Sequence, residues 1–217
     1  MVERGLSLAR RLRVYLVSPD GWGSRDGDEA RLWRLLRAGV GAVQFRDKSS
    51  VVDREGRASR MAALCREAGA LFIVNDHPEL ARDLGADGVH VGVSDASVAR
   101  ARALLGDAAI VGATASTLDR ALLAVGEGAD YLGVGAIFDA TASKPDAKTR
   151  GLEVVRELRS SPELRGTPLV AIGGITGDRA ASCYAAGADG VAMIRGLWSC
   201  EDPESLVRAL LASRRDV

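Results

Sequence analysis

One pattern recurs along the chain and limits the folds that it can adopt. A helix-length segment ends at a glycine, a few small or polar residues follow, and an uninterrupted apolar run begins. Glycine suits the left-handed backbone conformation that ends many helices, and continuous apolar runs are typical of parallel strands buried on both faces. The glycines are Gly39, Gly69, Gly85, Gly106, Gly128, Gly166 and Gly187. The pattern therefore predicts repeated alternation of a helix and a buried parallel strand.

With the opening apolar run, the pattern predicts eight strands, and a lead-in helix over residues 1–12 precedes the first of them. The strands lie near residues 13–18, 42–46, 71–75, 88–92, 109–114, 130–135, 168–173 and 190–194. Eight strand–helix units in 217 residues predict an α/β protein with one domain over residues 1–217, a (βα)8 TIM barrel. The alternative is an open doubly wound sheet, which typically has about five or six strands and often a glycine-rich dinucleotide turn that is absent after the first strand here.

Composition limits the partners of the chain. Its 29 basic residues balance its 29 acidic residues, so no general attraction to nucleic acid or to a membrane surface is expected. No apolar run approaches the ~18 residues of a membrane span, and the amino-terminal residues do not resemble a secretory signal. The three cysteines are an odd number without metal-site spacing, which is typical of reduced thiols in a cytoplasmic protein. We therefore expect small-molecule ligands and a cytoplasmic location, with a homodimer as a possible assembly.

In a TIM barrel the active site lies at the carboxyl ends of the strands, and the end of the second strand is rich in cations. Gln44, Arg46 and Lys48 alternate, so they share one face of the strand, the barrel interior. Two cations and an amide are costly to bury there unless an anion meets them. We favour anion binding over the alternative that Asp47 and other acids neutralise the two cations.

Acidic residues follow the next two strands. Asn75 and Asp76 end the third strand, and Asp95 follows the fourth. Neighbouring parallel strands lie about 4.8 Å apart, so these two carboxylates can share one ion. Mg²⁺ prefers one or two carboxylates together with phosphate oxygens of a substrate. The alternative is that the aspartates are helix N-caps, whereas His90, inside the fourth strand, is expected to be a core residue with satisfied hydrogen bonds.

The remaining strands carry further candidate ligand contacts. Thr114 ends the fifth strand and could hydrogen-bond a ligand. A long polar segment follows the sixth strand and could close over an anion, although an ordinary solvated loop is the alternative. Bare backbone after the seventh and eighth strands is where barrels commonly bind phosphate. These segments contribute Thr141, Ser143, Lys144, Gly173, Gly174, Ile194 and Arg195. One divalent-metal candidate, several cations and a second phosphate site suit chemistry on a diphosphate beside a monophosphate.

In these motifs the sequence resembles the thiamine-phosphate synthase family, which also contains thiazole tautomerases. The resemblance covers about residues 13–210, and its motifs recur in order along the chain. They are Gln-Phe-Arg-Asp-Lys at 44–48, Val-Asn-Asp at 74–76, Gly-Val-His-Val-Gly at 88–92 with Asp95 after it, Asp-Tyr-Leu-Gly-Val-Gly at 130–135, Ala-Ile-Gly-Gly-Ile at 171–175, and Gly-Ala-Asp-Gly-Val-Ala at 187–192.

The resemblance implies the same barrel and a transferase reaction. The family enzyme joins hydroxymethylpyrimidine diphosphate to a thiazole monophosphate, and the diphosphate leaves before the thiazole nitrogen attacks. Mg²⁺ and fixed cations stabilise the negative charge that builds on the leaving group. By the resemblance, the residues that hold the diphosphate are Gln44, Arg46, Lys48 and Asn75, and Thr114 lies near the pyrimidine. The resemblance also implies that the Mg²⁺ ligands are Asp76 and Asp95, and that the loop over the diphosphate contributes Thr141, Ser143 and Lys144. It implies that the thiazole phosphate binds at Gly173, Gly174, Ile194 and Arg195, and that the catalytic cations are Arg46, Lys48 and Lys144.

The sequence also departs from the family pattern. Gly92-Val93-Ser94-Asp95 replaces Gly-Gln-Glu-Asp, Thr114-Ala115-Ser116 replaces Ser-Ala-His, Gly135-Ala136-Ile137 replaces Gly-Pro-Ile, and Arg195 replaces a small residue. Two alternative functions are a thiazole tautomerase and a non-catalytic protein that binds phosphorylated ligands. A tautomerase would use a histidine where Ser116 stands, and the diphosphate and metal residues are all present, so the sequence favours the synthase.

Overall fold

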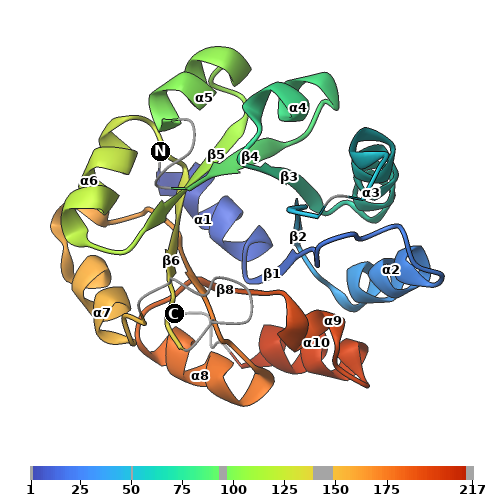
Figure 1. Ribbon diagram of the computed structural model, residues 1–217. Coiled ribbons are helices and arrows are strands. Elements are labelled where there is room, and N and C mark those ends of the chain that lie inside the picture. Colours follow the sequence, from blue (N-terminus) through green and yellow to red (C-terminus); the bar gives the residue numbers. More distant parts are fainter. Residues whose placement is uncertain (1, 50, 93–96, 139–148, 214–217) are drawn as a thin grey trace.

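The protein folds into a closed barrel of eight parallel strands in sequential order, β1 to β8 (Figure 1). The computed structural model describes residues 2–49, 51–92, 97–138 and 149–213, with side chains from residue 5 onward. The strands are β1 (Val14–Val17), β2 (Ala42–Phe45), β3 (Leu71–Asn75), β4 (Gly88–Val91), β5 (Ile110–Ala115), β6 (Tyr131–Gly135), β7 (Leu169–Ile172) and β8 (Gly190–Met193). The predicted TIM barrel is confirmed, and each predicted strand end lies within one residue of the observed end.

The helices from α2 (Asp28–Ala38) onward surround the barrel, whereas α1 (Val2–Arg11) lies inside their ring, at the amino end of the barrel (Figure 1). The other helices are α3 (Arg54–Ala68), α4 (Pro78–Asp83), α5 (Val98–Leu105), α6 (Leu118–Gly126), α7 (Glu153–Ser160), α8 (Gly177–Ala185), α9 (Arg195–Trp198) and α10 (Pro203–Ala212), with a short 3₁₀ helix at Pro162–Leu164. The sequence did not predict the 3₁₀ helix or α9, because three or four residues carry too little periodicity. None of the described helices is long and apolar enough to cross a bilayer.

The strands are buried on both faces, which explains their uninterrupted apolar runs. Along β1, Tyr15 and Val17 face the barrel interior, whereas Val14 and Leu16 pack with the surrounding helices. Leu8 and Leu12, from the lead-in segment, join the interior cluster. Because α1 leads directly into the amino end of β1, these leucines close that end, and the opposite end, which we call the mouth, remains for ligands.

Two strand glycines make room for polar side chains inside the barrel. A Cβ at Gly112 of β5 would overlap the ring of Tyr131, and one at Gly133 of β6 would lie 2.9 Å from Cε1 of His90. A glycine inside a strand often marks such a close approach. The interior of this barrel therefore contains a Tyr131–His90 pair that depends on two missing side chains.

We predict that Gly112→Ala lowers the free energy of unfolding by about 1–3 kcal/mol, because the added methyl group forces Tyr131 from its place. The measurement is urea unfolding followed by circular dichroism. Gly126→Ala is the control, because a Cβ there meets open space at the end of α6, and it should change stability by less than about 1 kcal/mol. Equal stability of the two variants would show that the interior tolerates the methyl group.

Candidate active site

Charged side chains from the loops after β1, β2 and β3 meet at the mouth. Nη1 of Arg46 donates to Oδ1 of Asp20 at 3.0 Å, and the same oxygen accepts the backbone N–H of Lys48 at 2.8 Å. The Arg46 side chain is only 16% exposed. Sequence reasoning missed Asp20, although an acid at this end of the first strand could have been considered as a partner for these cations. Asp20 thus satisfies the guanidinium where an anionic ligand would compete for it.

The loops after β2 and β3 approach each other through Lys48 and Asp76. Nζ of Lys48 lies 3.8 Å from Oδ2 of Asp76, and the amide of Asn75 donates to that oxygen at 2.6 Å. The Lys48 side chain is 59% exposed, so the ion pair is a solvated one that contributes little to stability. An ion pair of this kind costs little to break.

The backbone at Asp76 has an unusual conformation. Its φ is +63°, in the left-handed region that aspartate tolerates better than most residues. The N–H of Asp76 donates to the carbonyl oxygen of His90 at 2.8 Å, and the N–H of His77 donates to that of Asn75 at 2.9 Å. The N-cap of α4 is His77, so the alternative that Asp76 is the helix cap is wrong.

Asp47 does not neutralise the two cations beside it, but other acids do, because Arg46 pairs with Asp20 and Lys48 with Asp76. The alternative to anion binding is therefore wrong for Asp47 and confirmed for the other acids. Its carboxylate forms a buried ion pair with Arg57 of α3, and the two side chains are 1% and 2% exposed. The carboxylate also accepts the backbone N–H groups of Gly21 at 3.2 Å and Ser49 at 3.0 Å. Burial raises the pKa of Asp47, but these bonds and those from the Ser49 hydroxyl and Arg57 outweigh it and hold the pKa at about 2. The carboxylate therefore stays charged at neutral pH.

Arg57 satisfies its remaining donors with backbone carbonyl groups. Nη1 donates to the carbonyl of Trp22 at 3.0 Å, Nη2 to that of Val51 at 3.0 Å, and Nε to that of Val52 at 3.2 Å. One buried guanidinium thus joins the loop after β1 to the loop after β2. Sequence reasoning missed it, and the available signal was its place four residues before Met61 on the buried face of α3.

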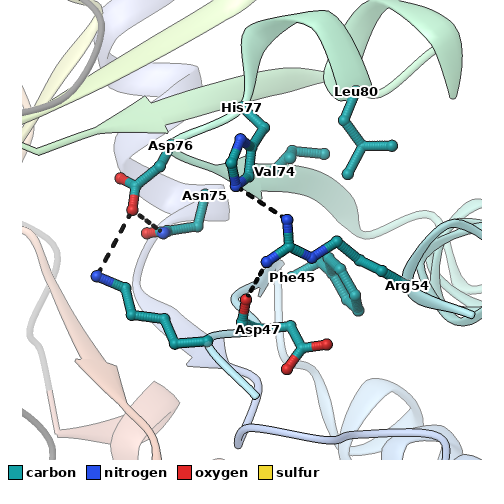
Figure 2. Close-up of a pocket in the computed structure, with 9 residues that line it drawn as sticks. Phe45, Asp47, Arg54, Val74, Asn75, Asp76, His77 and Leu80 are labelled. Carbon is teal, nitrogen blue, oxygen red and sulfur yellow. Dashed lines mark hydrogen bonds and ion pairs between the residues drawn. The ribbon is translucent and has the colours of Figure 1, made fainter. Parts of the chain in front are cut away.

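A second arginine of α3 joins the loop after β2 to the loop after β3. Nη2 of Arg54 donates to the carbonyl oxygen of Asp47 at 2.7 Å, and Nη1 lies 3.2 Å from Nε2 of His77 (Figure 2). These bonds border a cavity of about 80 Å³. Its lining is Phe45, Asp47, Lys48, Arg54, Val74, Asn75, Asp76, His77 and Leu80. Sequence reasoning also missed Arg54, which holds Asp47 and His77, the residues next to Lys48 and Asp76.

The loops after β7 and β8 lie at the same end of the barrel. Gly173 and Gly174 have φ values of +103° and +62°, which favour glycine. A Cβ at Gly173 would lie 2.7 Å from Ala136, so the close packing against the loop after β6 also requires glycine. Ile194 precedes α9, and Arg195, its first residue, is exposed. Because β7 pairs with β8 and β8 pairs with β1, this backbone and the charged loops belong to one mouth.

The other predicted residues fall into two groups. Gln44 is buried and donates to the Tyr15 hydroxyl at 3.0 Å, and Thr114 lies 3.0 Å from Nε2 of His90. His90 has hydrogen bonds at both ring nitrogens, as expected for a core residue. The second group, Asp95, Thr141, Ser143 and Lys144, lies outside the described residues.

The donors at the mouth suit Mg²⁺ only as a partial ligand set. In the described part of the chain, no group of three or more His, Cys, Asp or Glu side chains is placed to hold a metal ion. Asp76 supplies a hard carboxylate oxygen beside Lys48 and Asn75. One or two carboxylates with substrate phosphates are the usual Mg²⁺ ligands, so the donor chemistry fits an ion that binds together with a phosphorylated substrate.

A closed (βα)8 barrel with cations, a carboxylate and glycine backbone at its carboxyl end defines the class of barrel enzymes that act on small molecules. Comparison with known families specifies the class further. The family model described as thiamine monophosphate synthase matches residues 14–197. The chain belongs to the thiamine monophosphate synthase family.

Individual relatives agree with this assignment. A thiamine-phosphate synthase of Thioalkalivibrio sulfidiphilus is 44% identical over 215 residues, which cover 98% of both chains. One of Halorhodospira halophila is 46% identical over 180 residues, which cover 82% of this chain and 84% of that one. Among solved structures, thiamine phosphate pyrophosphorylase from Pyrococcus furiosus matches with a TM-score of 0.81 and 31% identity, covering 95% of this chain and 96% of that one. The likeness therefore extends over nearly the whole barrel.

We predict that Arg57→Met lowers the free energy of unfolding at pH 7 by about 3 kcal/mol, because it leaves the Asp47 carboxylate buried without its partner. In the parent protein, the pKa of Asp47 is lowered from its ordinary value of 3.8 to about 2, so its ionised form stabilises the fold at pH values above 3.8. This stabilisation is lost as the pH falls toward about 2. The variant should lose less stability over that interval. Denaturant unfolding at pH 7 and through the acid range measures both effects.

Arg60→Met is the matched control, since Arg60 lies on the same helix but forms exposed ion pairs with Glu29 and Asp53. It should cost less than about 1 kcal/mol. Similar losses in the two variants would contradict the role given to the buried pair.

Proposed function

We propose that this protein is a thiamine-phosphate synthase. It transfers the hydroxymethylpyrimidine group from its diphosphate to the ring nitrogen of thiazole phosphate and releases diphosphate. The observation that carries the proposal is the meeting of Arg46, Lys48, Asn75 and Asp76 at one edge of the mouth. Family membership over residues 14–197 supports the same reaction.

The reaction breaks the bond between the pyrimidine methylene carbon and the diphosphate oxygen, and the electron pair leaves with the diphosphate. The thiazole nitrogen then donates its lone pair to the methylene carbon. Positive groups that are already in place stabilise the leaving group more cheaply than water, which must reorient. Arg46 and Lys48 are such groups, because a diphosphate can replace Asp20 and Asp76 as their partners. We propose Lys144 as a third cation and Gln44, Asn75, Thr141 and Ser143 as hydrogen-bonding groups.

We propose that Asp76 and Asp95 hold Mg²⁺ in the complex with the substrate. The ion supplies positive charge to the leaving diphosphate when it is bound. The Asn75 amide, which donates to Asp76 at 2.6 Å, orients the carboxylate for this role. Lys48, at 3.8 Å, is then released toward the diphosphate.

The thiazole phosphate is proposed to bind on the other side of the mouth. Gly173 and Gly174 allow an anion to approach their backbone closely, and the amides of Ile194 and Arg195 come from the neighbouring loop. Thr114 lies between the two phosphate sites in chain order, at the end of β5, and is proposed to contact the pyrimidine diphosphate.

The remaining expectations are also proposals. We propose a one-domain enzyme that works in the cytoplasm, supported by the single closed barrel and the free cysteines Cys65, Cys183 and Cys200. The homodimer stays a prediction from the sequence, for which the mass in solution is the measurement.

We predict that the purified protein forms thiamine phosphate from both substrates when Mg²⁺ is present, and that Asp76→Asn lowers kcat by about a hundredfold or more. Asparagine keeps the left-handed backbone at this position and removes the charge. Chromatography of the product measures the rate, and circular dichroism confirms that the variant is folded.

Asp83→Asn is the control, because this exposed aspartate of α4 pairs with its neighbour Arg82; it should retain the parental rate. A rate for Asp76→Asn within threefold of the parent would refute the metal assignment. Conversion of a carboxythiazole phosphate tautomer without metal, in the absence of transfer, would instead identify an isomerase, and tight substrate binding without turnover would identify a binding protein.

A further inference from the structure

Five side chains from five strands form a continuous hydrogen-bonded chain inside the barrel, which we call the interior chain. Nε2 of Gln44 lies 3.0 Å from the Tyr15 hydroxyl, which lies 2.9 Å from the Tyr131 hydroxyl. The Tyr131 hydroxyl lies 3.0 Å from Nδ1 of His90, and Nε2 of His90 lies 3.0 Å from Oγ1 of Thr114. The interior chain therefore links two residues of the mouth from beneath.

The interior chain is enclosed by the barrel. Tyr15 and Tyr131 are fully buried, and Gln44 is 5% exposed. The tyrosine rings contact edge to face with centroids 6.1 Å apart, and the His90 ring lies 5.5 Å from that of Tyr131. Burial raises the pKa of both tyrosines, so both hydroxyl groups keep their protons. Buried donors need acceptors, and this requirement limits how the protons can be arranged.

The arrangement that satisfies every member has one direction. Gln44 donates to Tyr15, so the Tyr15 hydroxyl donates to Tyr131. Tyr131 then donates to Nδ1 of His90, and Nε2–H of His90 donates to Thr114. In the reverse arrangement, the Tyr15 oxygen would accept from both Gln44 and Tyr131. Its own proton would have no acceptor among the described residues, where its hydrogen bonds are those two, and this is costly in a buried site.

We propose that Tyr131 and His90 are positioning residues that hold Thr114 as a hydrogen-bond donor toward the mouth. The Thr114 oxygen accepts from His90, and its hydroxyl proton has no other acceptor among the described residues, so it can be donated to a ligand. The inference rests on the proposed function, in which the ligand at this place is the pyrimidine diphosphate. Thr114 would then donate to an acceptor atom of that substrate, a ring nitrogen or a phosphate oxygen, and would not contact the thiazole phosphate.

The first test reads the His90 tautomer and needs neither substrate nor turnover. The protein has two histidines, so ¹⁵N-histidine labelling gives two pairs of ring-nitrogen signals, and the pair that remains in His77→Asn belongs to His90. We expect a neutral ring with the proton on Nε2 and none on Nδ1. A proton on Nδ1 would overturn the proposal, since it would mean that the Gln44 amide is rotated and that every hydrogen bond of the interior chain runs in the reverse direction. A doubly protonated ring would overturn it as well.

The second test separates positioning from general loss of stability. Tyr131→Phe removes the donor to His90 and should lower kcat/KM for the pyrimidine diphosphate by about three- to tenfold, the effect of one net hydrogen bond. The KM for thiazole phosphate should not change. Tyr184→Phe is the matched control, because its hydroxyl donates to the carbonyl of Arg13 at 3.0 Å, at the opposite end of the barrel, and it should leave both parameters unchanged.

A double-mutant cycle shows whether the effect acts through Thr114. In a Thr114→Val background, Tyr131→Phe should have no further effect on kcat/KM for the pyrimidine diphosphate. Additive effects, or equal losses for both substrates, would overturn the proposal. An inactive parent protein would instead refute the proposed function, and the tautomer measurement would still decide the direction of the interior chain.

Discussion

The buried ion pair between Asp47 and Arg57 is the interaction on which the mouth of this barrel depends. Arg46 and Lys48 flank Asp47 in sequence, so fixing Asp47 fixes where both cations begin. Arg57 also holds three backbone carbonyl groups of the loops after β1 and β2. A buried ion pair often adds little net stability, because both charges lose their hydration. Its role here is better described as geometric, since it holds two loops in one relative position.

The other charged contacts of the mouth are more exposed than the Asp47–Arg57 pair. Arg46 meets Asp20, and Lys48 approaches Asp76 at 3.8 Å in an exposed position. The exposed Lys48 contact costs little to break, so under the proposed function it keeps a cation in place without preventing a phosphorylated ligand from binding. The protein therefore combines a rigid set of loop anchors with replaceable partners for the reactive side chains. This arrangement suits a transferase that must bind a diphosphate and later release it.

The sequence predicted the barrel well because its signals are local. Glycines end the helices and continuous apolar runs mark strands buried on both faces, so the ends of the eight strands fall within one residue. The charged residues after β2 and β3 could be proposed as a group because parallel strands bring their carboxyl ends together. The family motifs added proposed roles of these residues to what strand position alone could give.

The contacts that hold the site could not be read from the sequence. Arg54 and Arg57 resemble ordinary helix arginines until the fold places carbonyl groups around them. Tyr15, Tyr131 and His90 come from strands far apart in the chain, and only barrel closure joins them. The left-handed backbone of Asp76 depends on its bond to the His90 carbonyl, a contact between neighbouring strands.

In the proposed function, Asp76 and the cations after β2 receive the leaving diphosphate at one place. The most direct measurement is a crystal structure with Mn²⁺, which replaces Mg²⁺ and scatters anomalously, together with diphosphate and the product. We expect an anomalous peak bonded to an oxygen of Asp76 and to a diphosphate oxygen, with Arg46 and Lys48 turned from Asp20 and Asp76 to the diphosphate. A peak elsewhere, with both original ion pairs intact, would contradict it.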